Sequence, residues 1–343
     1  MKRLFQKKLF YSFVTAVLVL VSCEKEKGLD TINQSTEKQM IDFCGLKVKL
    51  PTGYDEKVLS LNLSDLQGNY YSNKSKFGLK SASSDEMDIT LEEMDNLVTS
   101  VLIHYPNTDS LTERDIEIIQ NDFNGIDEIK IYENIDVIDS FYNALIRYDY
   151  VDTLSKHYSL NLKSTNDYLG YDVSKAEFWA LVWHPRLVKP TRSATDKAIE
   201  LTGQYFPGQA AWRTKADAFR HAIWNALIAK YVGDKKNKID ECVDWAKKFT
   251  DKHEEGAERP ADMTQEDFDF DKAMDYHNNK IGRDYFKSVA WTDKRKWYQP
   301  TRVKAPSETT MADAIFEKTK VAKKVSSKSQ INSYPSNLVY IKD

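Results

Sequence analysis

The sequence is poor in cysteine, and this limits the kinds of site that it can build. Only three of its 343 residues are cysteines, namely Cys23, Cys44 and Cys242. They form no CxxC pair and no zinc-knuckle spacing, so a cysteine-based metal site is not expected. Cys242 stands at helical spacing with Trp245 and is predicted to be a small core residue. The spacing leaves open whether Cys44 and Cys242 form a disulfide.

Several familiar catalytic motifs and a basic surface are missing as well. HExxH is absent, because His253-Glu254 is followed by Glu-Gly-Ala, and there is no GxSxG, P-loop or His-Asp doublet. The formal net charge is −3, and removing the four cations of residues 1–22 would bring it near −7. Nucleic-acid binding normally needs a basic stripe, which the local basic run at 318–324 does not supply. No nucleic-acid partner is therefore expected.

Long apolar runs are missing except at the N-terminus. A positive segment, MKRLFQKK, precedes an apolar stretch from Leu9 to Val21. The stretch is shorter than the ~20 residues of a transmembrane helix and is typical of a secretory signal peptide. It ends in LVSC, which resembles the lipobox of bacterial lipoproteins. The resemblance implies cleavage before Cys23 and lipid on its thiol and new amino terminus. An ordinary secreted protein is the alternative.

The segment after Cys23 is charged and weakly hydrophobic. It begins with EKEK and continues to about Lys38, which predicts a solvated tether that reaches on the order of 20 Å. Charges directly after the cysteine also resemble the export signal of surface-displayed lipoproteins in some Gram-negative groups. We therefore expect an extracytoplasmic protein that binds the membrane through lipid at Cys23, in the outer membrane of a bacterial cell envelope.

The rest of the chain has the composition of a folded, mainly α-helical protein. Its hydrophobic content is 41%, with 19 Tyr, 15 Phe and 7 Trp. The predicted organisation is a signal peptide (1–22), lipidated cysteine and tether (23–40), a smaller mixed or helical module (41–165) and a helical domain (166–343). In the module, residues 42–84 fit either strands or irregular structure. Capping boxes at Thr90–Glu93 and Ser110–Glu113 then open two helices, and a third is expected at 134–148.

The C-terminal half is predicted to be mostly helical. Apolar periodicity, Gly and Pro delimit the helices and a short terminal strand. The expected helices are 174–183, 193–202, 215–231, 239–253, 266–288 and 311–324, and the strand is 337–341.

Two of these helices carry polar residues at the same spacing. Each set follows i, i+3, i+4, i+7, i+8, which forms one stripe on a helix. The first set is Asp217, Arg220, His221, Trp224 and Asn225, and the second is Asp275, Asn278, Asn279, Gly282 and Arg283. An indole and a glycine at matched positions indicate that the stripes face other protein, or each other, instead of water.

Three sequence blocks in this half resemble an uncharacterised bacterial domain family. They are DAFRHAIWNAL, WAKKFTDKHEE and MDYHNNKIGR, which occur in the order of the family pattern D-A-F-R-H-x-x-W-N, H-E and M-D-x-x-N-N-x-x-G-R. The family occurs in secreted lipoproteins and at the C-termini of toxin-like proteins. The resemblance covers about residues 176–288 and leaves out the N-terminal half. It implies a helical domain but no particular reaction.

The residue types themselves suggest hydrolytic chemistry. His221 is the predicted general base or metal ligand, because histidine titrates near neutrality and Asp217 lies one turn away to orient it. Asp275 and Asn279 complete the predicted catalytic set. The predicted substrate-binding residues, which would hold an anionic group, are Arg220, Arg283, Asn225 and Asn278. Together they predict a hydrolase of a phosphoester or ester.

A divalent metal is a further possibility at this site. His253 and Glu254 could join His221 and Asp275 around a cation. Imidazole with carboxylate suits zinc or manganese, and oxygen-rich sets suit calcium or magnesium.

The alternative is a non-enzymatic surface lipoprotein in which the two stripes form a buried structural network. In that case Asp217 would pair with Arg283 and Asp275 with Arg220, while Asn225 would cap a loop, as would Asn279. The other histidines are predicted to be structural, with His277 packed in the core and the remaining three being His104, His157 and His184.

Overall fold

The computed structural model describes residues 40–76, 86–160, 171–210, 212–293 and 301–343. The predicted signal peptide, Cys23 and nearly all of the tether lie outside these residues, as does the predicted boundary near Thr165. Residues Lys38–Asp343 form one unit. No described helix is long and apolar enough to cross a membrane.

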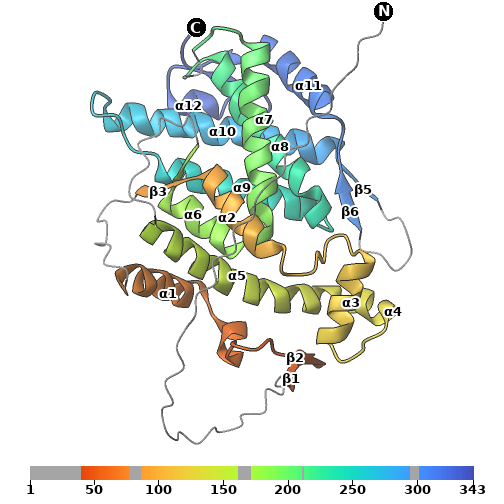
Figure 1. Ribbon diagram of the computed structural model, residues 1–343. Coiled ribbons are helices and arrows are strands. Elements are labelled where there is room, and N and C mark those ends of the chain that lie inside the picture. The colour runs from red at the N-terminus through yellow and green to blue at the C-terminus, as the bar shows by residue number, and fades with distance from the viewer. Residues whose placement is uncertain (1–39, 77–85, 161–170, 211, 294–300) are drawn as a thin grey trace, which may run out of the picture. The chain divides into compact units, whose positions relative to one another are not determined.

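The fold is mainly α-helical, as predicted (Figure 1). The described residues form the helices α1 (Leu63–Lys76), α2 (Leu91–Leu102), α3 (Glu113–Asp122), α4 (Glu128–Glu133), α5 (Ile135–Leu160), α6 (Lys175–Trp183), α7 (Val188–Tyr205), α8 (Lys215–Tyr231), α9 (Ile239–Gly256), α10 (Gln265–Val289), α11 (Glu308–Lys320) and α12 (Lys328–Ile331). Short 3₁₀ turns at Pro185–Leu187 and Val232–Lys235 follow α6 and α8.

Strands are few and occur in pairs. Three pairs are antiparallel: β1 (Met40–Phe43) with β2 (Leu46–Lys49), β3 (Glu86–Thr90) with β4 (Asp172–Ser174), and β5 (Trp291–Asp293) with β6 (Arg302–Lys304). The fourth pairs β7 (Lys323–Lys324) in parallel with β8 (Val339–Tyr340), inside the predicted terminal strand. The first pair and α1 occupy the region for which the sequence left strands or irregular structure open.

Helix α1 was not predicted, and its polar sequence explains why. Its buried residues Leu66 and Tyr70 lie one turn apart in an otherwise polar segment, which gives little apolar periodicity. They enter the same core as Tyr150 and Leu154 of α5, against which α1 packs. Tertiary packing, and not local propensity, therefore accounts for this helix.

Side-chain caps fix several helix starts. The capping box from Thr90 to Glu93 is present at α2, as predicted. At α3 the predicted box is wrong by two residues: Thr112 is the cap and Asp115 its partner, which places the helix start at Glu113. The same motif begins α6, where Ser174 caps the helix.

The predicted C-terminal helices are present, with some changes at their ends. Helix α8 begins and ends where the sequence predicts. Helix α7 differs most from its predicted range of 193–202, because it starts at Val188 and continues to Tyr205. Pro190 lies in its first turn, where a missing amide hydrogen costs no intrahelical bond.

The main core surrounds α8, and helices α7, α9, α10 and α11 all pack against it (Figure 1). Alanines and large apolar residues such as Phe219 and Leu227 are fully buried along α8. The cluster also contains Leu66 and Tyr150, so residues from both sides of position 165 share one core. Apolar residues of β1, β2, α3, α4 and the first half of α5 form a second cluster. Helix α8 therefore holds its polar residues deep inside the protein.

The two described cysteines do not form a disulfide. Cys44 is exposed in the β1–β2 turn, where its φ of 52° is left-handed, and Cys242 is buried on α9. The prediction of Cys242 as a core residue is confirmed.

Candidate functional site

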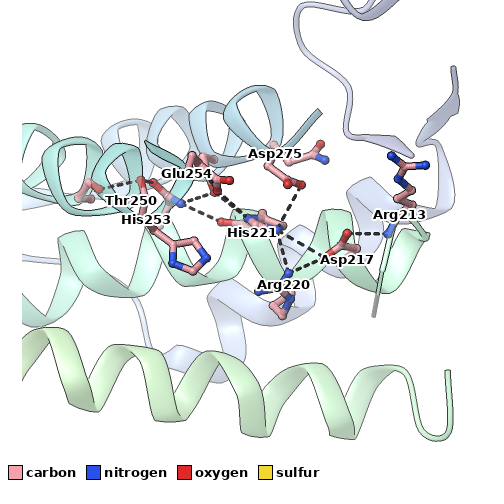
Figure 2. A network of polar contacts seen from close by, with 12 residues as sticks. Arg213, Asp217, Arg220, His221, Thr250, His253, Glu254 and Asp275 are labelled. Atoms are coloured by element: carbon pink, nitrogen blue, oxygen red, sulfur yellow. Dashed lines mark hydrogen bonds and ion pairs between the residues drawn. The ribbon is translucent and has the colours of Figure 1, made fainter. Parts of the chain in front are cut away.

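The polar stripes of α8 and α10 face each other in the interior (Figure 2). Gly282 of α10 lies directly against the backbone of Ala222 of α8. The absence of a side chain at this position allows the two helices to approach closely, so that polar groups on both can bond directly. The expectation that the stripes meet, away from bulk water, is confirmed by this packing.

His221 is the centre of the site and lies among three carboxylates (Figure 2). Its Nε2 is 3.2 Å from Asp275 Oδ1 and 3.4 Å from Asp217 Oδ1, and its Nδ1 is 3.7 Å from Glu254 Oε1. The imidazole and the carboxylates of Asp217 and Glu254 are almost fully buried. Such a surplus of buried acid over base must be offset by nearby cations or retained protons.

The guanidinium of Arg220 and a backbone N–H supply part of this compensation around Asp217. Arg220 Nη2 donates to Asp217 Oδ1 at 2.6 Å and lies 2.9 Å from His221 Nε2. The backbone N–H of Arg213 donates to Asp217 Oδ2 at 2.7 Å. Arg220 and Asp275 reach the surface, with 32% and 15% of their side chains exposed. This edge is the part of the cluster that meets solvent.

Asn279 fixes the opposite side of the imidazole. Its Oδ1 is 3.2 Å from His221 Nδ1 and accepts from Asn225 Nδ2 at 2.7 Å, while its own Nδ2 donates to Glu254 Oε1 at 3.1 Å. The side-chain amide oxygen therefore accepts the Nδ1 proton, which leaves Nε2 directed at Asp217 and Asp275. Asn279 of α10 therefore fixes the orientation of the His221 ring, while carboxylates of both helices, Asp217 of α8 and Asp275 of α10, determine the charge around it.

A second, deeper layer joins α8, α9 and α10. Asn225 Oδ1 accepts from Arg283 Nη1 at 2.6 Å and from Thr250 Oγ1 at 3.0 Å. All three side chains are buried. Arg283 is therefore placed in the interior, and not at the exposed edge where a substrate could meet it directly; the same holds for Asn225.

The neighbouring charges change the proton affinities of the site. Burial and the charge of Arg220 would lower the pKa of His221, but the charge of Asp275 and the bond and charge of Asp217 raise it to about 9. Burial would raise the pKa of Asp217, but the bond and charge of His221 and the charge of Arg220 lower it to about 2. Burial raises the pKa of Asp275 well above its usual range, and the charges of Glu254 and Asp217 add to this. His221 thus carries a proton at neutral pH.

The ion pairs differ from those predicted for a structural network. Asp217 pairs with Arg220 on its own helix, and Arg283 bonds to an amide, so neither predicted cross-helix pair is formed. Asn225 and Asn279 lie in the middle of their helices and bond across them, so the prediction that they cap loops is wrong. The sequence spacing correctly predicted which residues share a helix face. It did not predict which of them form ion pairs or hydrogen bonds with one another.

His253 belongs to a separate group of polar residues. Its Nδ1 is 2.6 Å from Tyr171 Oη and 3.2 Å from Glu177 Oε1, and its ring packs edge-on against Trp224. Figure 2 shows it directed away from His221. The structure thus does not bring His253 to the predicted metal set. The adjacent Glu254 lies 3.7 Å from His221 Nδ1, whereas Asp275 lies at Nε2, so Glu254 and Asp275 meet different nitrogens of the ring.

The remaining polar residues of α10 hold the C-terminal segment. Asn278 is fully buried and exchanges two hydrogen bonds with the backbone of Val339, one through each side-chain atom. His277 Nε2 donates to the Asn337 carbonyl at 2.8 Å and is half-buried, so the packed position predicted for it holds only in part. Asn278 thus anchors β8. It is buried against this strand and does not occupy the substrate-binding position predicted for it.

Sequence reasoning missed Thr250 and Arg213, which contact the predicted residues. Thr250 lies one turn before Glu254 on the inward face of α9, so extending the stripe pattern to this helix would have found it. Arg213 lies just outside α8 with a left-handed φ of 64°, a conformation that no spacing rule indicates.

Among the described residues, three side chains have donor atoms close enough to hold a metal ion together. These atoms, one each from Asp217, His221 and Asp275, all lie within 4.8 Å of one another. The guanidinium of Arg220 already contacts the same region, so a metal would have to displace a resident cation. The arrangement is therefore more immediately suited to proton transfer.

The comparisons with known proteins identify this region as similar to an uncharacterised domain. Residues 178–323 match the model of a domain of unknown function (DUF6973), and this range contains α8, α9, α10 and the whole cluster around His221. Neither the curated proteins nor the solved structures gave a match. The predicted resemblance to an uncharacterised domain family is confirmed over this part of the chain.

Proposed function

We propose that this chain is a hydrolase of phosphoesters or esters that acts through His221 and Asp275. We further propose that it is an extracytoplasmic protein, anchored to the membrane by lipid at Cys23. The observation that carries the proposal is the pairing of a proton-holding imidazole with a buried carboxylate oxygen. Asp275 Oδ1 lies 3.2 Å from His221 Nε2, yet among the described residues it has no partner with hydrogen-bond geometry.

A network that only stabilises a fold has little reason to leave this oxygen unsatisfied. Buried polar atoms without partners are rare in native proteins, and strongly shifted carboxyl and imidazole groups gather at functional sites. Here both features lie directly beneath the edge of the cluster that solvent reaches, between Asp275 and Arg220. This coincidence favours chemistry over a purely structural role.

The shifted proton affinities suggest how the two residues divide the work. A carboxylate of raised pKa is a suitable base near neutrality, and a protonated imidazole is a suitable acid. In hydrolysis, Asp275 takes a proton from water as the water oxygen bonds to the phosphorus or carbonyl carbon. His221 then gives its proton to the leaving oxygen as that bond breaks. The proton held by Asp275 returns to His221 across their 3.2 Å contact.

This division modifies the role predicted from sequence for His221. With a pKa of about 9 the ring is already protonated at neutral pH, so it donates where the sequence predicted a general base. Asp217 and Asn279 act by holding the ring. Arg220 remains the candidate for contact with an anionic group of the substrate, because it alone among the predicted binding residues is substantially exposed.

Metal-assisted hydrolysis would use the same side chains. A divalent cation would require His221 to lose its proton and Arg220 to turn away from Asp217. The metal content of the purified protein tests this version directly.

Chromogenic substrates test the proposal. Purified wild-type chain, Asp275→Asn and His221→Gln are assayed with p-nitrophenyl esters and with bis-p-nitrophenyl phosphate. Asp284→Asn is the matched control, because Asp284 is an exposed aspartate of the same helix that pairs with Lys280. We expect turnover by the wild type and the control and a loss of at least roughly a hundredfold in the two site variants. Full activity in folded Asp275→Asn would overturn the assignment.

The structural alternative is favoured by the deeper layer of the site. Asn225, Thr250 and Arg283 are buried and bonded to one another, and together they connect three helices. If the whole cluster serves this purpose, the wild type turns over neither substrate, and Asp275→Asn changes the melting temperature alone.

A further inference from the structure

A group of cationic side chains surrounds His184, which directly follows α6. Arg147 comes from α5, Lys236 follows the 3₁₀ turn after α8, and Lys248 lies on α9. Arg147, His184 and Lys236 line a cavity of about 80 Å³, and Lys248 contacts the ring of His184. None of these residues belongs to the cluster around His221.

The carboxylates in the wall of this cavity already have other cations as partners. Asp109 pairs with Lys235 at 2.7 Å, and Asp139 lies 3.5 Å from Arg186 Nε and accepts from Thr108. Neither acid forms an ion pair with Arg147, Lys236 or Lys248, although the charge of Asp139 opposes part of the lowering that burial causes in the pKa of Arg147.

Three cations around His184 form no ion pair with a carboxylate of the described residues. Arg147 uses Nε for the Trp183 carbonyl, at 2.8 Å, and stacks its guanidinium 4.1 Å from the centre of the Trp183 ring. Lys248 Nζ donates to His184 Nε2 at 3.0 Å. Lys236 has no side-chain hydrogen bond or ion pair in the described structure. The excess charge is notable in a chain whose formal net charge is negative.

The proton affinities of the group agree with uncompensated positive charge. Burial and the charges of Lys248, Lys236 and Arg147 lower the pKa of His184 to about 3. Burial and the neighbouring cations also lower the pKa of Lys248. His184 is therefore neutral, and since its Nε2 accepts from Lys248, its Nδ1 carries the proton and is a donor.

We propose that this cavity binds a phosphate-type oxyanion, held by Arg147, Lys236, Lys248 and the Nδ1–H of His184. The donor set matches the group, because guanidinium and ammonium ions with directed N–H bonds are the usual partners of phosphate oxygens. The size matches as well. One water needs roughly 10–15 Å³ of such space, so about 80 Å³ accommodates four phosphate oxygens.

A larger cavity, with both apolar and charged residues in its wall, shares Trp183 with the cationic one. It has a volume of about 760 Å³, and its wall includes Trp179, Ala180 and Leu63 together with Lys248, Glu255 and Glu258. A phosphate that carries an apolar group could therefore place each part in a suitable environment. Free phosphate and a lipid headgroup share the chemistry that the cationic cavity recognises.

Histidine NMR of the full chain tests the proposal with inorganic phosphate at low ionic strength. The His184 ring signals, assigned with His184→Gln, should shift saturably, and the pKa of His184 should rise as the anion offsets the cations. Lys236→Gln and Lys248→Gln should each weaken binding about tenfold or more. Lys247→Gln is the matched control, because Lys247 neighbours Lys248 on α9 but pairs with Asp251 on the exposed surface.

Vesicles distinguish the two sources of the anion. A response to phosphate alone identifies a soluble ligand, while a response to phosphatidylglycerol vesicles, but not to phosphatidylcholine vesicles, identifies a headgroup. If neither probe moves the His184 signals of the folded protein, or if Lys236→Gln and Lys248→Gln bind as the control does, the site is refuted. The hydrolase assay uses different residues, so the two proposals fail independently.

Discussion

Gly282 on α10 rests on the main-chain carbonyl of Ala222 on α8, so closely that a methyl group at residue 282 would overlap the oxygen. His221 directly precedes Ala222, and Asn279 lies one turn before Gly282. The contact between the two backbones therefore sets the distance over which the imidazole and the amide bond. A change that separates the two helices would therefore also disrupt the geometry of the site.

Gly282→Ala should destabilise the protein, because neither backbone can yield without separating the helices. We expect a loss of about 1–3 kcal/mol in the free energy of unfolding, measured with urea, as for other overpacked cores. Gly203→Ala is the control. Gly203 is exposed within α7 and has nothing within 4 Å of an added methyl group, so alanine should be neutral or slightly stabilising there. Equal effects of the two substitutions would contradict the close packing.

The meeting of the two polar stripes could be predicted from sequence because it depends on helical periodicity. Asp217, His221 and Asn225 share one face of any helix at that spacing, and Trp224 and Gly282 at matched positions indicated that the stripes face protein and not water. The bounds of α8 followed equally well from periodicity and flanking turn residues. Such features depend on residues near one another in the sequence.

The partners within the site depend on depth and on contacts between distant segments. Arg283 was expected to bind substrate, but it lies below the surface and bonds to Asn225 and Thr250. His253 and Glu254 are adjacent in sequence, yet only Glu254 faces His221, because successive residues of a helix point about 100° apart. The rotation of α9 about its own axis determines which of the two residues faces His221, and the sequence motifs do not specify this rotation.

Asn279→Ala should be costly, because it leaves several buried groups without partners. The substitution removes the acceptor for Asn225 Nδ2 and His221 Nδ1 and the donor to Glu254. We expect a loss of about 3 kcal/mol or more in the free energy of unfolding. Asn121→Ala, on the exposed face of α3, should change it by less than about 0.5 kcal/mol. Calorimetry or urea unfolding of the pair measures the difference, and a small effect at Asn279 would contradict the network.

The two described cysteines should differ sharply in reactivity. Cys44 is exposed, whereas Cys242 is fully buried and burial raises the pKa of its thiol to about 12. A maleimide should therefore label Cys44 in the native protein and Cys242 only after unfolding, because the thiolate is the reactive form. Peptide mass spectrometry identifies the labelled residue. A native Cys44–Cys242 disulfide would instead protect both thiols until a reductant is added.

The proposed anchor makes a separate prediction about Cys23. Cys23→Ser should abolish lipid attachment and move the protein from the membrane fraction to the soluble fraction, since acyl chains contribute ~0.8 kcal/mol per buried methylene. Radiolabelled fatty acid incorporation and membrane fractionation measure this. Cys44→Ser is the control and should stay in the membrane. Unchanged labelling of Cys23→Ser would rule out this cysteine as the anchor.

The cluster around His221 should make the protein less stable as the pH rises above neutrality. The pKa of His221 is raised from 6.5 to about 9 in the folded protein. Its contribution is therefore fully present below pH 6.5 and is lost as the pH rises through about 9. The difference corresponds to roughly 3 kcal/mol. Asp275, whose pKa is also raised, acts in the same direction, whereas Asp217, with a lowered pKa, loses its contribution only as the pH falls below 3.8 toward about 2.

Urea unfolding at intervals from pH 6 to 10 should show the decline in wild type and in Asp284→Asn. His221→Gln should be less stable at pH 6 and should decline less across this window, because the contribution of the imidazole is gone while that of Asp275 remains. A decline of the same size in His221→Gln would show that other groups cause it and that the imidazole is not charged in the folded protein.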